Sequence, residues 1–201
     1  MQNSIIYRNI ALYRLVMNLL YLGGYKNRFK DVIDLLGNSD RSVVELCFGD
    51  TYFAEYCKQK GVSWTGYDIS AYFVQNAVSK GYDAYHCDIL KGPFLKDADV
   101  CVMIGSLYHF EKDIGKLLGA MINTAPKIIL SEPIKNLTNS NRLLSYLSKK
   151  MTDAGKGEEQ FRYTRKTVLD MLNAQQKELG FTYEIIKENR DILIMITRGY
   201  N

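Results

Sequence analysis

The stretch Val43-Val44-Glu45-Leu46-Cys47-Phe48-Gly49-Asp50-Thr51 contains the features that decide the fold. It begins as an apolar β-run, carries an acid at its third residue and breaks into a turn of small residues at Gly49. A helical pattern follows from about Tyr52. A buried strand, a tight turn and a helix whose free N–H groups face a ligand are the start of a nucleotide site in a parallel sheet.

Apolar runs and turns repeat along the chain after Ser42. Strands are predicted at 42–47, 63–68, 82–87, 98–104 and 127–131, with helices between them at 52–60, 70–80 and 111–123. The strands are near-continuous apolar runs, which is typical of buried parallel strands. This alternation predicts an α/β fold with a parallel, right-handed, doubly wound sheet and helices on both of its faces.

Further elements flank this core at both ends. Two helices, at 4–22 and about 27–36, are predicted before the first strand and form an N-terminal helical cap. After Pro133 we expect an amphipathic helix at about 139–152, a helix from Thr164 to Gly180, and a hairpin of strands 181–187 and 191–198. We therefore expect residues 1–201 to form a single domain, with the cap in 1–40, a cofactor-binding half in 41–133, and substrate-side helices with the terminal hairpin in 134–201.

The net charge of +4 is unevenly distributed along the chain. Residues 1–41 hold 6 Lys and Arg against 3 Asp and Glu, residues 42–133 hold 8 against 11, and residues 134–201 hold 12 against 8. The middle of the chain is therefore acidic and both flanks are basic. A cationic ligand in the middle and an anionic partner near the flanks fit this distribution, and so does ordinary variation of the surface.

The cysteines and the apolar N-terminal run bear on the compartment. The four cysteines have no CxxC spacing, so we expect reduced, structural thiols, a cytoplasmic protein and no zinc or other metal site. The apolar run from Ile5 to Leu22 is interrupted by Arg8, Asn9, Arg14 and Asn18, so we expect no transmembrane segment. The basic residues lie inside this run rather than ahead of it, which argues against a signal peptide. A helix at 4–22 that lies on a membrane surface remains an alternative.

Polar residues recur where the predicted strands end, and in a wound sheet ligands bind beyond the carboxyl ends of the strands. Glu45, Asp68 and Asp88 belong to three successive strands, at intervals of 23 and 20 residues. The fourth strand is followed by Gly105-Ser106-Leu107-Tyr108-His109, and the fifth ends in Ser131-Glu132-Pro133. Glu45 lies in a buried run and needs a ligand or a neighbouring donor, because an unpaired buried charge is costly.

The turn after the first strand is poor in glycine. Cys47 and Thr51 occupy two positions at which a pyrophosphate-binding loop requires glycine, so a nucleoside without phosphates suits this turn better. Asp68 is placed to bind ribose hydroxyls, and its alternative role is to cap a helix that starts near Ser70. Asp88 is placed to accept a hydrogen bond from the amino group of a base, and its alternative role is to stabilise a turn.

In these segments the chain resembles the class I S-adenosylmethionine-dependent methyltransferases, specifically those that act on small molecules. Glu45–Thr51 resembles the first motif of that family, Gly66-Tyr67-Asp68-Ile69-Ser70 resembles its acidic loop, and His86–Leu90 resembles its adenine-binding segment. Residues 98–110 are similar to its fourth strand and the following loop, and residues 162–181 to the helix that leads into its sixth strand. The resemblance covers about residues 41–198.

The resemblance implies a Rossmann-like, seven-stranded sheet of order 3-2-1-4-5-7-6 with the seventh strand antiparallel, and S-adenosylmethionine as the cofactor. Glu45 and the backbone of the turn after it would hold the methionine end, Asp68 the ribose, and Asp88 with Ile89 the adenine. The cofactor-binding residues implied in this way are Glu45, Leu46, Cys47, Gly49, Asp68, Ile69, Asp88, Ile89, Gly105 and Ser106.

The implied reaction is an in-line displacement at a sulfonium methyl group, in which the enzyme mainly aligns and desolvates the reactants. A general base is needed only when the acceptor is a hydroxyl or a protonated amine. His109, with Tyr108 beside it, is the expected base because histidine titrates near neutral pH; its alternative role is to hydrogen-bond the backbone near the cofactor. Four further residues are expected to bind the acceptor: Tyr13, Glu132, Arg162 and Tyr163.

The basic flanks favour an anionic small-molecule acceptor, such as a sugar, nucleotide sugar or lipid head group, methylated at oxygen or nitrogen. Nucleic-acid substrates are not expected, because no Asn-Pro-Pro-Tyr-like sequence follows the fourth strand and no dense Lys/Arg stripe occurs. Two other functions stay open. One is an NAD(P)-dependent oxidoreductase, which the glycine-poor turn disfavours, and the other is a catalytically inactive cofactor-binding relative, which Cys47 and Thr51 in glycine positions favour.

Overall fold

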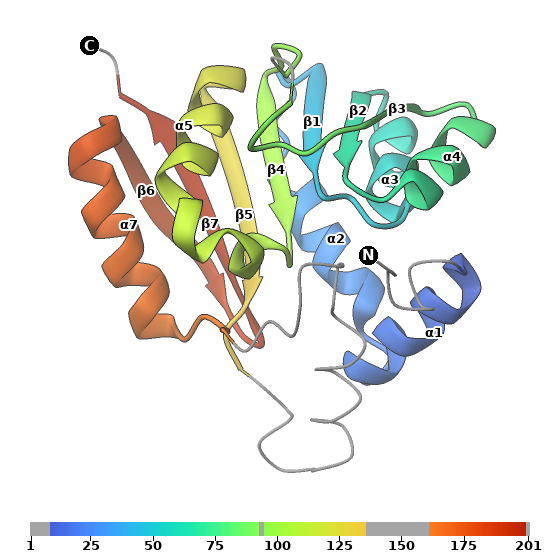
Figure 1. The fold of residues 1–201 in the computed structure, drawn as a ribbon, viewed down its shortest axis with the longest axis horizontal. Helices are drawn as coiled ribbons and strands as arrows, with labels where there is room; N and C mark the ends of the chain where they lie inside the picture. The colour runs from blue at the N-terminus through green and yellow to red at the C-terminus, as the bar shows by residue number, and fades with distance from the viewer. Residues whose placement is uncertain (1–8, 93–94, 136–160, 200–201) are drawn as a thin grey trace.

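Seven strands form one sheet in the computed structural model, which describes residues 9–92, 95–135 and 161–199 (Figure 1). In spatial order the strands are β3 (Asp83–His86), β2 (Ser63–Asp68), β1 (Ser42–Leu46), β4 (Val100–Ile104), β5 (Lys127–Pro133), β7 (Asp191–Arg198) and β6 (Phe181–Glu188). The expected order 3-2-1-4-5-7-6 is confirmed.

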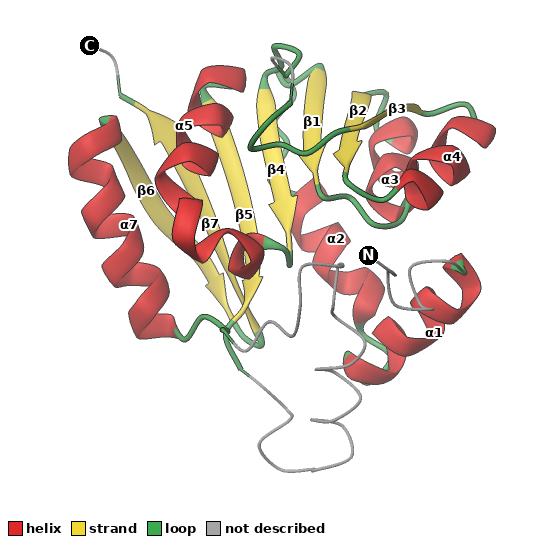
Figure 2. Ribbon diagram, in the orientation of Figure 1, coloured by secondary structure: helices red, strands yellow, loops and turns green. Residues whose placement is uncertain are grey.

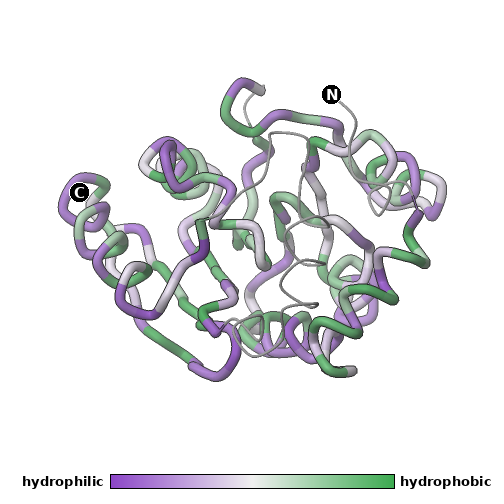
Figure 3. Tube along the Cα trace, turned by 60° about the horizontal axis from the view of Figure 1, so that its bottom comes forward, coloured by the Kyte–Doolittle hydropathy of each residue, from purple (hydrophilic) through white to green (hydrophobic). Residues whose placement is uncertain are grey.

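Helices cover both faces of the sheet and give three layers (Figure 2). On one face α2 (Tyr25–Ile33), α3 (Tyr52–Gln59) and α4 (Ala71–Ser79) bury an aromatic-rich cluster that includes Phe29, Phe53 and Phe73. On the other face the 3₁₀ helix η2 (Leu107–Asp113), α5 (Ile114–Thr124) and α7 (Arg165–Leu179) pack on aliphatic residues of β4, β5 and β7. Helix α1 (Ile10–Leu20) lies next to α2. Apolar and polar stretches alternate along the helices (Figure 3), as expected for helices with one buried side.

The first five strands run parallel, whereas β7 pairs antiparallel with both β5 and β6. Strand β4 is buried along its whole length because helices cover it on both sides. The strands β1, β4 and β5 point toward the lower edge of the sheet in Figure 1, where α1 and α2 also lie. This edge is the place where a wound sheet binds its ligand.

The local sequence explains where α7 begins and ends. The Thr167 N–H donates to Thr164 Oγ1 at 3.2 Å, and the Thr164 N–H donates to Thr167 Oγ1 at 2.9 Å. This reciprocal cap satisfies two backbone donors that the first turn of a helix leaves free. Gly180 ends the helix in the left-handed conformation, with φ 65°. The helix expected between Thr164 and Gly180 is therefore confirmed.

Other boundaries differ from the expected ones. The helix expected at 27–36 spans Tyr25–Ile33, because Gly24 already occupies its N-cap position. The helix expected at 4–22 is Ile10–Leu20, and residues 4–8 lie outside the described residues, as does the whole helix expected at 139–152. Residues 107–110, expected in a loop, begin η2. A non-helical residue, Phe110 (φ −112°, ψ 16°), interrupts η2, so helical periodicity becomes visible only after it.

In the part of the chain that the structure describes, no helix is long and apolar enough to cross a membrane. The four cysteines are free thiols, and three of them are buried. Within residues 9–92, 95–135 and 161–199, no three His, Cys, Asp or Glu side chains gather in a way that could hold a metal ion.

Candidate functional site

The turn after β1 contains two residues in the left-handed region of backbone conformation. Cys47 has φ 56° and Gly49 has φ 61°. For a non-glycine residue this conformation costs on the order of 1 kcal/mol. The Cys47 N–H donates to the carbonyl of Tyr67 at 2.7 Å, which ties the turn to β2. Cys47 therefore adopts the backbone shape that glycine would adopt freely, although it carries a side chain.

Asp68, the last residue of β2, joins this turn to the start of α4. Its Oδ2 accepts a hydrogen bond from the Gly49 N–H at 2.9 Å, and its Oδ1 accepts one from the Ser70 N–H at 2.7 Å. Burial raises the pKa of the Asp68 carboxyl group, while the two backbone donors and nearby His109 oppose that rise. Ser70 is itself the N-cap of α4, so the Ser70 contact closes a turn ahead of the helix and is not the expected capping of its first turn. Each carboxylate oxygen can accept a second hydrogen bond, so Asp68 keeps the capacity to bind hydroxyl groups as well.

Glu45 has the neighbouring donor that its burial requires. It is 1% exposed, and its Oε2 accepts a hydrogen bond from the indole N–H of Trp64 at 2.8 Å. Burial raises the pKa of the Glu45 carboxyl group well above its usual range. The Trp64 ring meets the Phe48 ring of the turn edge to face, with centroids 5.2 Å apart. Glu45 and Trp64 therefore fix the turn through Phe48.

Helices α1 and α2 cover the turn with tyrosines. The Asp50 carboxylate accepts hydrogen bonds from the Tyr25 hydroxyl at 3.2 Å and from the Tyr52 N–H at 2.8 Å. Burial raises the pKa of Asp50 to about 6. A Cβ atom added at Gly49 would lie 2.9 Å from the Tyr13 hydroxyl oxygen. Tyr13, expected at the acceptor, is therefore placed against the turn expected to hold the cofactor.

The variant Gly49→Ala tests this close approach. Its methyl group would meet the Tyr13 hydroxyl in a backbone conformation that L residues rarely adopt, so we expect the free energy of unfolding to fall by about 1–2 kcal/mol. Gly61→Ala is the matched control, because Gly61 has φ 70° but no atom within 4 Å of its Cβ position. Denaturant unfolding measures both variants. Equal losses would assign the effect to backbone strain alone rather than to Tyr13.

The remaining residues expected to hold a nucleoside follow β2 and β3. Asp88 Oδ1 accepts a hydrogen bond from the Leu90 N–H at 3.2 Å, and Asp88 Oδ2 lies 3.6 Å from Lys91 Nζ. These contacts stabilise the turn after β3, which is the alternative role expected for Asp88. Ile69 is 40% exposed, which leaves an apolar surface that a flat base could cover. Ile89 is half-buried and packs against the core.

A buried arginine from α2 lies against the end of β4. Gly105 has φ 70°, and a Cβ atom added there would overlap Nη2 of Arg28. Arg28 is 7% exposed, and its Nε lies 3.2 Å from Asp191 Oδ2. Its Nη2 has no hydrogen-bond partner among the described residues. A buried donor without a partner is costly, so this guanidinium group is a candidate ligand-binding group at the β4 end.

Helix η2 brings the expected catalytic residues together. The rings of Tyr108 and His109 are 4.0 Å apart between centroids, and the His109 N–H donates to the Ser106 carbonyl at 3.2 Å. The Arg162 guanidinium carbon lies 3.9 Å from the centroid of the Tyr108 ring, which is a cation–π contact. His109 is half-buried, whereas Tyr108 is buried. Tyr108, His109 and Arg162 therefore form one cluster beyond β4.

Glu132, near the end of β5, is a buried acid with one unpartnered oxygen. It is 1% exposed, its Oε2 accepts a hydrogen bond from the Leu107 N–H at 3.0 Å, and its Oε1 has no partner among the described residues. Burial raises the pKa of Glu132 to about 8, although the Leu107 N–H and the positive charges of Arg28 and Arg162 oppose the rise. Burial and the charge of Glu132 also raise the pKa of Tyr163. Burial therefore places the pKa of Glu132 far above that of an ordinary glutamate.

Two residues of this site were not among the expected ones. The pattern of Phe29, Val32 and Ile33 marks α2 as amphipathic, but it does not show that Arg28 beside it turns inward. Trp64 could have been found, because a buried Glu45 requires a donor and the single tryptophan of the chain lies on the next strand. Its indole N–H can only donate.

No protein-family model matches this chain, and no curated protein matches its sequence. Its fold is similar to that of solved methyltransferases. A SAM-dependent methyltransferase from Archaeoglobus fulgidus gives a TM-score of 0.67 at 16% identity, over 92% of this chain and 99% of that one. Magnesium protoporphyrin IX methyltransferase from Synechocystis PCC 6803, solved with bound SAH, gives 0.63 at 16% identity, over 88% of this chain and 84% of that one. Human N-acetylserotonin methyltransferase in complex with SAM gives 0.65 at 20% identity, over 97% of this chain and 58% of that one.

Proposed function

We propose that this chain, which has the fold of the class I S-adenosylmethionine-dependent methyltransferases, is an enzyme of that kind and transfers a methyl group to a small-molecule acceptor. The observation that carries the proposal is the left-handed turn at Cys47 and Gly49, whose Gly49 N–H donates to the Asp68 carboxylate at 2.9 Å. In the sheet order 3-2-1-4-5-7-6, β1 lies between β2 and β4. The chain order of the strands reverses there, and wound sheets bind ligands at such a point.

The residues at this point fit a sulfonium nucleoside. Asp68 provides a carboxylate for ribose hydroxyls, and Ile69 provides exposed apolar surface for the adenine. The side chain of Cys47 hinders the close backbone approach that a pyrophosphate requires, which supports a nucleoside without phosphates over NAD(P).

When bound, S-adenosylmethionine would supply an electrophilic methyl group on sulfur, and the chain would align the acceptor and take up its proton. Glu132, with a pKa of about 8 and an unpartnered Oε1, is suited to accept a proton from an acceptor hydroxyl or amine. His109 is the second candidate base. Arg162 and Tyr108, in their cation–π contact, would bind the acceptor beside it. Tyr13 and Tyr25 would exclude water from the turn.

Titration calorimetry with S-adenosylhomocysteine and with NAD tests the proposal. We expect S-adenosylhomocysteine to bind with one molecule per chain and NAD to give no heat of binding, because Cys47 hinders a pyrophosphate. Tight NAD binding without any response to S-adenosylhomocysteine would contradict the methyltransferase assignment and support the oxidoreductase instead.

A second candidate function is a catalytically inactive relative that only binds the cofactor. It is favoured by the side chains at two glycine positions: Cys47, and Thr51, whose buried hydroxyl accepts a hydrogen bond from Lys80 Nζ at 2.8 Å. Incubation with methyl-labelled cofactor and a cell extract separates the two functions. Label transferred to any small molecule excludes the inactive relative, whereas binding of S-adenosylhomocysteine without transfer supports it.

A further inference from the structure

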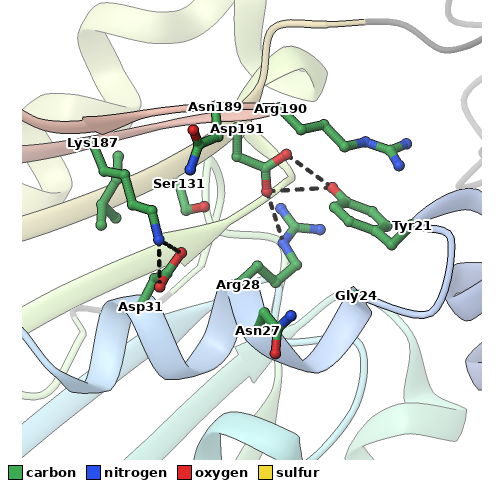
Figure 4. Close-up of a pocket in the computed structure, with 11 residues that line it drawn as sticks. Tyr21, Gly24, Asn27, Arg28, Asp31, Ser131, Lys187, Asn189, Arg190 and Asp191 are labelled. Atoms are coloured by element: carbon green, nitrogen blue, oxygen red, sulfur yellow. Dashed lines mark hydrogen bonds and ion pairs between the residues drawn. The ribbon is translucent and has the colours of Figure 1, made fainter.

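A polar cleft opens between α2 and the β6–β7 hairpin, on the face of the sheet opposite to η2 (Figure 4). Its cavity volume is about 120 Å³. Leu193 is the only aliphatic side chain among the residues that line it. This volume accommodates several water molecules, and therefore one phosphate or carboxylate group, but it is too small for a nucleotide.

The charged side chains of the cleft leave an excess of positive charge. The Asp31 carboxylate accepts hydrogen bonds from Lys187 Nζ at 2.8 and 2.9 Å, and Asp191 Oδ2 lies 3.2 Å from Arg28 Nε. Arg190 also lines the cleft, and among the described residues it forms no ion pair. Three cations and two already paired carboxylates therefore give the lining a net charge of +1.

Hydrogen-bond donors without partners face the same space. Figure 4 shows Asn189 next to Ser131 on one side of the cleft and Asn27 of α2 on the other. The side chains of these three residues have no hydrogen-bond partner in the described part of the chain; Asn27 and Asn189 are exposed, whereas Ser131 is buried. Arg28, also buried, has two guanidinium nitrogens without a hydrogen bond. Buried polar groups normally have partners, so the unpartnered Nη2 of Arg28 indicates a ligand that accepts hydrogen bonds.

The cleft adjoins the candidate functional site through two shared residues. Ser131 precedes Glu132 in β5, and its carbonyl accepts a hydrogen bond from the Gly105 N–H at 2.6 Å. Arg28 lies against Gly105 and is also paired with Asp191 in the cleft. A group bound in the cleft therefore lies beside the ends of β4 and β5, where the acceptor is expected.

We propose that this cleft binds a phosphate or carboxylate group of the methyl acceptor, which makes the acceptor an anionic small molecule. The inference rests on the proposed methyl transfer. Charge-assisted hydrogen bonds from Lys187 and Arg28, together with the amides of Asn27 and Asn189, are the contacts that such an oxyanion takes. The two basic flanks of the chain meet in this cleft, because Arg28 comes from the first flank and Lys187 and Arg190 come from the last.

Inorganic phosphate is the probe for the cleft, and Asn189→Asp is the main variant. We expect phosphate to raise the Tm of the wild-type protein in a saturable way, as any ligand of the folded state does. Asn189→Asp keeps the shape of the side chain but adds a negative charge to the lining, so phosphate affinity should fall at least about tenfold. Lys187→Gln, at an ion pair that is partly exposed, is a second variant in which we expect a loss of the same kind.

Asn173→Asp is the matched control for the added charge. Asn173 lies on α7, and its Oδ1 accepts a hydrogen bond from the Tyr183 hydroxyl at 2.8 Å, which an aspartate can also accept. Phosphate should stabilise this variant as it does the wild type. The comparison also removes the general stabilisation that phosphate salts give to folded proteins. The proposed site is overturned if phosphate gives no saturable rise in Tm. It is also overturned if phosphate raises the Tm of Asn189→Asp and of Asn173→Asp equally.

Methyl transfer from labelled cofactor to a cell extract tests whether the phosphate or carboxylate group bound in the cleft belongs to the acceptor. We expect the labelled product to be retained on an anion-exchange resin, and phosphate to inhibit its formation in the wild type and in Asn173→Asp. Phosphate binding without inhibition would overturn the acceptor assignment in favour of a free anion. Calorimetry with S-adenosylhomocysteine on the same protein distinguishes the two proposals. Absence of S-adenosylhomocysteine binding overturns methyl transfer, whereas the phosphate titration still shows whether the cleft binds an anion.

Discussion

Asp68→Ala is expected to lose at least about 100-fold of its affinity for S-adenosylhomocysteine and about 3 kcal/mol of its free energy of unfolding. The Asp68 carboxylate accepts hydrogen bonds from the Gly49 N–H at 2.9 Å and the Ser70 N–H at 2.7 Å. Its removal leaves two buried donors unpaired, frees the turn after β1, and takes away the carboxylate that is proposed to bind ribose hydroxyls. Calorimetry measures the affinity, and denaturant unfolding measures the stability.

Two further variants show whether the effect belongs to this carboxylate. Asp68→Asn keeps one carbonyl oxygen but sets an amide N–H₂ against a backbone N–H, so its stability should lie between wild type and Asp68→Ala. Asp170→Asn is the control. It removes an exposed carboxylate paired with Lys166 on α7, and such surface ion pairs contribute little to the free energy of unfolding. Normal binding of S-adenosylhomocysteine by Asp68→Ala would remove the main support for the proposed cofactor.

Glu132→Gln is expected to slow methyl transfer at least about 100-fold while leaving the affinity for S-adenosylhomocysteine within about threefold of the wild type. Glutamine keeps the shape of Glu132 and an oxygen for the Leu107 N–H, but it cannot take up a proton. The kcat with labelled cofactor is the measurement. Glu188→Gln, at a surface pair with Arg165, is the control and should leave kcat unchanged. A large loss of S-adenosylhomocysteine affinity in Glu132→Gln would instead give Glu132 a structural role.

The same variant should flatten the dependence of stability on pH. In an unfolded chain the pKa of a glutamate is about 4.3, whereas burial raises the pKa of Glu132 in the folded protein to about 8. Between these values the folded state holds a proton that the unfolded state has released. The free energy of unfolding therefore falls as pH rises through this range, by up to about 1.4 kcal/mol per pH unit, and levels off above about pH 8. Unfolding of wild type and Glu132→Gln at several pH values isolates this contribution from that of the other buried acids.

The strands and the acids at their ends could be predicted from sequence for a simple physical reason. A strand covered by helices on both faces, such as Val100–Ile104, is a continuous apolar run, and parallel strands bring their carboxyl ends to one edge. Asp68 could be assigned a place at that edge without any knowledge of its contacts. The order of the strands follows only from the family resemblance, because nothing in a buried apolar run shows which strand lies beside it.

The features that could not be predicted depend on contacts between distant parts of the chain. Arg28 turns inward because α2 packs beside the β6–β7 hairpin, where Asp191 lies 163 residues further along the chain. Tyr13 lies over Gly49 because α1 folds back on the turn after β1, and its position against this turn has no local signal in the sequence. The 3₁₀ helix that carries His109 has a non-helical residue at Phe110, and it therefore lacks the periodicity by which helices are detected.

Strand β7 lies between β5 and β6 in the sheet, although it follows both of them in the chain. Until residues 191–198 dock, the edge of β5 stays open along the apolar run Ile128-Ile129-Leu130. An open apolar edge is a template on which other chains can pair. Closing it requires contacts between residues that are far apart in sequence, which form slowly. This topology therefore makes refolding, rather than the finished fold, the stage at which the molecule is most exposed to aggregation.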